Sequence, residues 1–108
     1  MRLGPGRAWL LLVAAAAAPA LAADAVAGRQ KALPCAVCHG PLGLAVALDA
    51  PHLAGQSAQY LGLQLRAYRS GARKHEVMSL MAKPLSDADI DDLVAWFSSL
   101  QVSVQPVP

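Results

Sequence analysis

The stretch that decides the fold is Cys35-Ala36-Val37-Cys38-His39-Gly40. Cys-x-x-Cys followed at once by His is the attachment signature of c-type haem. Two thiols within one helical turn can reach the two haem vinyl groups, and the histidine projects from the same turn toward the iron. The sequence therefore predicts covalent attachment of haem to Cys35 and Cys38, with His39 as the proximal iron ligand.

Three other kinds of site share part of this pattern. A thioredoxin-like dithiol belongs to a strand–helix–strand pattern, which this sequence lacks. A structural zinc site needs four ligands, and the other two histidines, His52 and His75, are 23 residues apart and form no ligand pair. A disulfide between Cys35 and Cys38 would close almost no loop and would constrain the unfolded chain little. Haem is therefore the favoured cofactor.

Residues 1–22 have the pattern of a secretory signal peptide. Arg2 and Arg7 flank the start, an apolar run covers residues 8–18, and Ala20-Leu21-Ala22 supplies a small-residue cleavage signal. The run is shorter than the about 20 apolar residues that a membrane span needs, so an uncleaved anchor is the less favoured alternative. We therefore expect export to the periplasm and a mature protein with one domain, residues 23–108.

Charge and size narrow the function further. Beyond residue 22 the chain has seven basic and seven acidic residues, so the formal charge of +2 belongs to the leader. A near-neutral domain lacks the dense basic patch that nucleic-acid binding requires, so we expect no nucleic-acid partner. Removal of 22 residues from 108 leaves 86. The core of so small a domain is limited, and such domains usually depend on a disulfide, a metal or a bound cofactor for stability. A covalent haem would supply that stabilisation.

Helical periodicity and capping residues predict an all-α fold, with three to four helices wrapped around one covalently attached haem. The expected helices are residues 24–33, ended by Pro34; 57–70, between Ser57 as N-cap and Gly71 as stop; and 86–100, opened by a capping box at Ser86. We expect loops over residues 40–55 and 72–84 and a frayed tail from about residue 101.

The second axial position of the iron decides the chemistry. A side chain there favours electron transfer, whereas an open position favours binding of small ligands. The candidates are His52, His75, Met78 and Met81. Both methionines lie in the predicted loop over residues 72–84, where a methionine is more informative than on a helix face. Residue chemistry alone leaves the two methionines open.

Taken together, these residues resemble a class I c-type cytochrome, most closely one half of the dihaem periplasmic cytochromes c and their single-haem relatives. The resemblance is carried by Gly28, the motif at residues 35–40, Pro51-His52-Leu53-Ala54-Gly55-Gln56, Tyr60-Leu61, Gln64-Leu65, residues 68–73, residues 78–81, Leu85-Ser86-Asp87 and residues 92–97. It covers nearly all of residues 24–100, with one haem motif only.

The resemblance implies roles that spacing did not provide. Gly28 and Trp96 would mark the crossing of the first and last helices. Pro51 would offer its carbonyl to the second imidazole nitrogen of His39 and so fix the ring. The residues implied at the cofactor are Pro51, Leu53 and Tyr60, with Met78 as the second axial ligand and Met81 as the alternative.

The expected function is that of an exported single-haem electron carrier, cycling between Fe(II) and Fe(III) and transforming no substrate. The alternative is a haem subunit of an oxidoreductase complex, for example one that oxidises a sulfur compound. The apolar residues 42–48 motivate this alternative, because they could be buried at a permanent interface. A third interpretation is a ligand-binding haem protein with an open site. We expect redox proteins as partners, a homodimer or larger assembly as possible states, and contact with the membrane only through the export signal.

Overall fold

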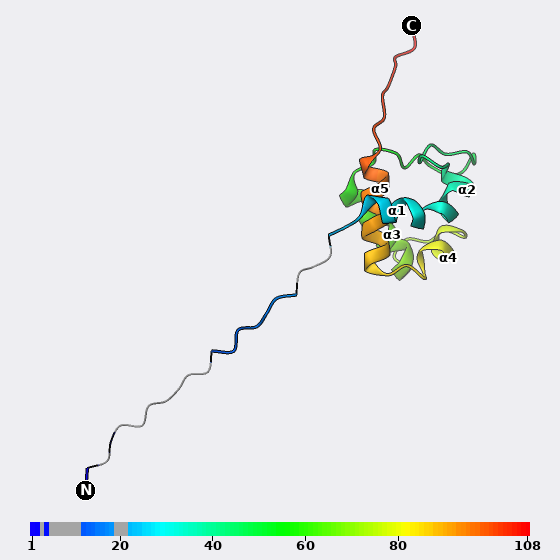
Figure 1. Cartoon of the computed structure of the whole chain (residues 1–108). Helices are drawn as coiled ribbons and strands as arrows, with labels where there is room; N and C mark the ends of the chain where they lie inside the picture. Colours follow the sequence, from blue (N-terminus) through cyan, green and yellow to red (C-terminus); the bar gives the residue numbers. More distant parts are fainter. Residues whose placement is uncertain (3, 5–11, 19–21) are drawn as a thin grey trace.

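The computed structural model describes residues 1–2, 4, 12–18 and 22–108. The predicted signal peptide includes residues 3, 5–11 and 19–21, so that prediction falls in part outside the described residues. The elements, shown in Figure 1, are α1 (Ala25–Lys31), the 3₁₀ helix η1 (Leu33–Cys35), α2 (Ala36–His39), α3 (Ala58–Ser70), α4 (Met78–Ala82) and α5 (Asp87–Ser99). No strand occurs in the described residues, and the all-α prediction is confirmed. Among these elements, none is a helix both long and apolar enough to cross a membrane.

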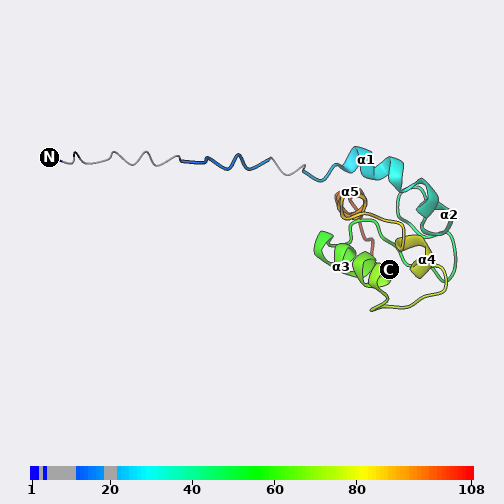
Figure 2. The ribbon, with the colours of Figure 1, turned by 90° about the horizontal axis from the view of Figure 1, so that it is seen from below.

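Helices α1 and α5 cross in close contact, as Figures 1 and 2 show. At Gly28 an added Cβ would lie 1.9 Å from the carbonyl oxygen of Asp92 and 2.9 Å from the Cβ of Trp96. Only glycine fits such an approach between backbones. Lys31 strengthens the crossing, because its Nζ lies 2.7 Å from a carboxylate oxygen of Asp92. The predicted crossing at Gly28 and Trp96 is therefore present.

Helices α3 and α5 begin and end as their capping residues predict. The Ser57 hydroxyl accepts a hydrogen bond from the Tyr60 N–H, and Gly71 ends α3 in the left-handed region with φ 85°. In α5 the Ser86 side chain accepts from the Asp89 N–H while the Asp89 carboxylate accepts from the Ser86 N–H. This reciprocal capping box satisfies two N–H groups that a helix start otherwise leaves unpaired.

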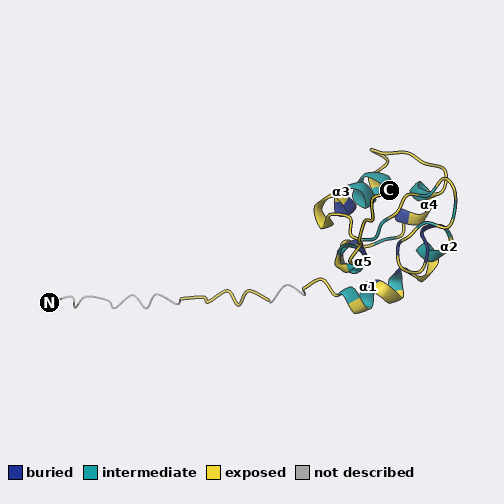
Figure 3. Cartoon of the chain, turned by 90° about the horizontal axis from the view of Figure 1, so that it is seen from above, coloured by how far each residue is buried: buried dark blue, intermediate teal, exposed yellow. Residues whose placement is uncertain are grey.

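The hydrophobic core is small. Both α1 and α3 pack on α5, and α4 packs on α3. The buried apolar residues among the described ones are Ala32, Leu61, Ala82, Ile90, Leu93 and Phe97. Figure 3 shows how little of the ribbon is fully buried. Six buried apolar side chains are few for a domain of this length, which is the shortage that a bound apolar cofactor would relieve.

Two predicted boundaries were wrong. The first helix ends at Lys31, two residues earlier than predicted. Pro34 does not end the helical structure, because it is the middle residue of the 3₁₀ helix η1. Proline has no N–H, and the first turn of a helix does not need one. Residues 72–84 are not all loop, since they contain α4. The fully buried Ala82 anchors that short helix in a way that periodicity does not reveal.

Candidate functional site

Cys35 and Cys38 lie in one run of helical turns. Cys35 is the last residue of η1 and Cys38 is the third residue of α2, and both are free thiols. Cys35 packs against the hydrophobic core. Burial raises the pKa of its thiol, which keeps the sulfur protonated and slows adventitious reactions. The helical placement of the two thiols is the one that the motif requires.

His39 is the last residue of α2, and the loop that follows contacts its side chain. The residue is 7% exposed, and its Nδ1 lies 2.9 Å from the carbonyl oxygen of Pro51. A carbonyl oxygen only accepts hydrogen bonds, so Nδ1 carries the hydrogen, and of the two neutral tautomers this is the one whose lone pair is on Nε2. A neutral imidazole in this tautomer, with its ring orientation fixed, can bind a metal through Nε2.

The same loop closes on itself and so brings Pro51 to His39. The Gly43 carbonyl accepts hydrogen bonds from the N–H groups of Leu53 at 2.7 Å and Ala54 at 3.0 Å. The Leu53 side chain is partly buried against the hydrophobic core. The position of the Pro51 carbonyl is thus set by main-chain bonds on one side and by core packing on the other.

Helix α4 carries both candidate methionines. Met78 is its first residue and is half-buried, whereas Met81 is 38% exposed. Figures 1 and 2 show α2 and α4 on the same side of the domain, away from α5. The two helices do not pack against each other. The segments that carry the predicted ligands therefore lie on the same side of the domain.

The residues of this site fit a haem better than a bare metal ion. No group of three or more His, Cys, Asp or Glu side chains that could hold a metal occurs in the described part of the chain. A zinc site therefore lacks ligands there. Haem needs only the two thiols and His39, and its apolar faces would extend the small core. A surface pocket of about 660 Å³ near His75 is lined by neither cysteine nor by His39, so it is a separate feature.

The other candidate residues lie at the surface. The Nδ1 of His52 accepts a hydrogen bond from the Ala45 N–H at 2.8 Å, and the Nδ1 of His75 accepts from two N–H groups at the start of α4. Each imidazole thus already supports the backbone of its own loop. Tyr60 lies in the first turn of α3 and is 47% exposed.

Sequence reasoning missed the residue that anchors the C-terminal end of the methionine segment, residues 71–86 between α3 and α5, which carries both methionines. Arg69, in the last turn of α3, donates hydrogen bonds to the Leu85 carbonyl at 3.0 Å and to the Asp87 carboxylate at 2.6 Å. Arg73 anchors the start of the segment, donating to the Gln64 side chain at 2.7 Å. Basic residues near the C-terminus of a helix are a weak signal of such contacts, since their usual partners are the helix's own carbonyls.

Comparisons with known proteins identify the family of the chain. The family model described as cytochrome c matches residues 25–101. Cytochrome c-554(548) of Halomonas halodenitrificans is 47% identical over 81 residues, which are 72% of this chain and 98% of that protein. A thiosulfate dehydrogenase electron acceptor of Stutzerimonas stutzeri is 45% identical over 69 residues, which are 61% of this chain and 32% of that protein. The crystal structure of reduced cytochrome c4 from Pseudomonas stutzeri has a TM-score of 0.71 and 41% identity, covering 77% of this chain and 48% of that chain.

The chain therefore belongs to the cytochrome c family. Its cofactor is covalently bound haem c, and its function is electron transfer. A haem held by these residues would supply one-electron chemistry between Fe(II) and Fe(III) at its iron. The chain spans nearly all of the Halomonas protein but about a third of the thiosulfate dehydrogenase electron acceptor.

Proposed function

We propose that this protein is a periplasmic electron carrier whose single haem is held by Cys35 and Cys38 and ligated by His39 and Met78. The observation that carries the proposal is the hydrogen bond between His39 Nδ1 and the Pro51 carbonyl, 2.9 Å long. It presents Nε2 as a metal ligand and holds the ring against rotation. A fixed ligand suits electron transfer, because the chain then has little to rearrange when the charge of the site changes.

Met78 is proposed over Met81 on two grounds. The resemblance to class I cytochromes favours the methionine seven residues before Leu85. Met78 is also the less exposed of the two, at the start of α4 where the backbone is bonded to His75. A thioether ligand in an apolar setting favours the reduced state and raises the reduction potential. The protein would therefore accept electrons readily from a donor of low potential.

Optical spectra of the exported protein test this assignment. We expect a c-type spectrum on reduction and, on oxidation, a weak far-red thioether-to-iron band that is lost in Met78→Ala and kept in Met81→Ala. Loss in Met81→Ala alone would move the ligand and keep the function. A wild-type protein that lacks the band and binds CO rapidly when reduced would favour an open ligand-binding site instead.

The proposed periplasmic location rests on the leader over residues 1–22. N-terminal sequencing of the protein purified from its host tests this proposal. We expect a mature chain that begins at Ala23, whereas an intact leader in the membrane fraction would show an uncleaved anchor.

A second candidate function is that of a haem subunit in a complex that oxidises a sulfur compound. Two observations favour it. The chain is similar to a protein described as a thiosulfate dehydrogenase electron acceptor. The apolar segment at residues 42–48 is also largely exposed. Its exposed members are Leu42, Leu44, Val46 and Leu48. Gentle purification of the tagged protein from its host, beside Leu48→Asp, separates the two functions. A stoichiometric dehydrogenase lost in Leu48→Asp would favour the subunit, and a monomeric haem protein in both would favour the carrier.

A further inference from the structure

The turn that leads into α4 is held by the imidazole of His75. Its Nδ1 accepts hydrogen bonds from the backbone N–H groups of Val77 and Met78, both at 3.2 Å. An acceptor that binds the second and third N–H groups after its own residue is the arrangement of a helix N-cap. His75 therefore caps the turn over residues 75–79 that leads into α4 and ends on its first residues, although α4 itself begins after Val77 without a side-chain cap and histidine is not among the usual N-cap residues.

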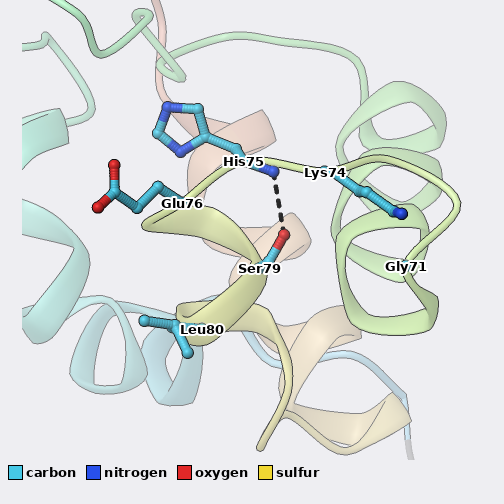
Figure 4. Close-up of a pocket in the computed structure, with 6 residues that line it drawn as sticks. All are labelled: Gly71, Lys74, His75, Glu76, Ser79 and Leu80. Atoms are coloured by element: carbon cyan, nitrogen blue, oxygen red, sulfur yellow. Dashed lines mark hydrogen bonds between the residues drawn. The ribbon is translucent and has the colours of Figure 1, made fainter.

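Ser79 completes the cap from the other direction. Its hydroxyl accepts a hydrogen bond from the His75 N–H at 3.0 Å, the bond drawn in Figure 4. The Ser79 N–H in turn donates to the His75 carbonyl at 2.9 Å. This bond joins residues four apart, as in an α-helix, and it links the turn at His75 to α4. Side chain and main chain thus bind each other across residues 75–79 in a reciprocal pair that resembles a capping box, with the second side chain one residue later than in the usual motif. Figure 4 shows both residues at the same end of α4.

This cap matters because α4 has little else to hold its first turn. The helix has five residues, and helices so short are unstable without capping or tertiary packing. Its packing is at the far end, where Ala82 is fully buried, whereas residues 75–77 are exposed. The arginine contacts lie outside the helix, at Arg73 before it and at Leu85 after it. The His75 imidazole, in contrast, bonds the Met78 backbone N–H directly.

We propose that His75 is a positioning residue for Met78: its imidazole fixes the turn that leads into α4 and so holds the methionine where it ligates the iron. The inference rests on the proposed ligand assignment and adds to it a residue outside the ligand set. It predicts that loss of the cap shifts the protein from the state with methionine bound toward the state with methionine released, without removing any ligand.

Imidazole binding to the oxidised holoprotein measures this equilibrium, because added imidazole takes the iron position only when the methionine has left it. Apparent affinity then scales with the fraction of protein in the released state. His75→Ala is expected to raise the affinity for imidazole by roughly fivefold, the factor that corresponds to the loss of one N-cap. The far-red thioether band should weaken and the reduction potential should fall in the same variant.

Two further variants test the mechanism. His75→Asn should restore near wild-type imidazole affinity, because an asparagine side chain accepts the same bonds at an N-cap. Ser79→Ala removes the reciprocal bond only and should raise the affinity by a smaller factor. Ser79→Ala also provides the test if His75→Ala yields too little holoprotein.

Ser57→Ala is the matched control, since it removes the N-cap of α3, a helix that carries no proposed iron ligand, at the end opposite to Arg69. It should lower the stability of the fold and leave imidazole affinity unchanged. Equal affinity increases in Ser57→Ala and His75→Ala would overturn the inference, because the effect would then be a general loosening. Wild-type affinity in both His75→Ala and Ser79→Ala would also overturn it.

Met78→Ala separates this inference from the proposed function. If Met78→Ala abolishes the thioether band and His75→Ala behaves as wild type, the ligand assignment stands and the positioning role fails. If the band survives Met78→Ala, both the assignment and the positioning role fail. A wild-type protein without the band, in which His75→Ala opens the iron to CO, would make His75 itself the ligand and would overturn both.

Discussion

His39 and Pro51 are twelve residues apart in sequence, yet the His39 Nδ1 lies 2.9 Å from the Pro51 carbonyl oxygen. The acceptor is a main-chain atom, so it is set by the path of the loop and not by the identity of the side chain. That path is closed by the Gly43 carbonyl, which accepts from Leu53 and Ala54 just beyond Pro51. The orientation of the imidazole therefore depends on the closure of a loop as much as on the proline.

Substitutions at these two positions should have unequal effects. Pro51→Ala keeps the carbonyl and mainly frees the unfolded chain, so we expect a loss of about 0.4–1 kcal/mol and an almost unchanged spectrum. At Gly43, with φ 73°, an added Cβ would lie 2.8 Å from the Ala54 nitrogen. Gly43→Ala should therefore cost about 2 kcal/mol or more and shift the reduction potential. Urea unfolding and redox titration of both holoproteins provide the comparison, and equal effects would contradict it.

Gly28→Ala should be the most damaging alanine substitution in the α1–α5 crossing. The new Cβ would meet backbone atoms of Asp92 that cannot move aside without separating the helices. We expect a loss above the about 3 kcal/mol typical of severe overpacking, or failure to accumulate as holoprotein. Gly71→Ala is the control, because its Cβ would meet nothing within 4 Å. It should cost about 1–2 kcal/mol for the left-handed backbone alone, as measured by urea unfolding.

Acid should weaken the start of α5 through Asp89. The Ser86 N–H, and after it Lys31, lowers the pKa of Asp89 to about 2. A carboxyl whose folded pKa lies below its unfolded value stabilises the fold above the unfolded pKa and loses that contribution as the pH falls toward the folded pKa. We therefore expect stability to fall between about pH 4 and pH 2 and to fall less steeply in Asp89→Asn. Urea midpoints across this range, with Asp49→Asn as control, test this; equal slopes in all three proteins would refute it.

Trp96 should tolerate replacement by phenylalanine. Its Nε1 is buried and has no hydrogen-bond partner in the described structure, and leaving such a donor unpaired costs about 1–3 kcal/mol. Trp96→Phe removes that cost and gives up some packing, so we expect a change within about 1 kcal/mol. Trp96→Ala should cost about 3 kcal/mol, because the ring packs beside Gly28 and under Arg29. Thermal unfolding followed by circular dichroism measures both, and similar losses would contradict the prediction.

Much of the fold was predictable because its signals are local. The motif at residues 35–39 places two thiols and an imidazole on one helical turn. Ser57, Gly71 and the Ser86–Asp89 pair mark helix ends through hydrogen bonds that span no more than a few residues. The helix crossing at Gly28 was predicted from the family resemblance. Its physical reason, the close approach of the Asp92 carbonyl that leaves no room for a Cβ, is visible only in the structure.

The sequence by itself determined the all-α class, the haem motif and the ends of α3 and α5, because each depends on neighbours within one or two turns. Tertiary structure alone decided that residues 78–82 are helical, that Arg69 reaches Leu85, and that His75 caps the turn of Met78. The physical reason is that a five-residue helix has little intrinsic stability, so its existence depends on the buried Ala82, on α3 and on the cap. Those contacts form only when the chain has folded, so the periodicity of the sequence does not predict the helix over residues 78–82.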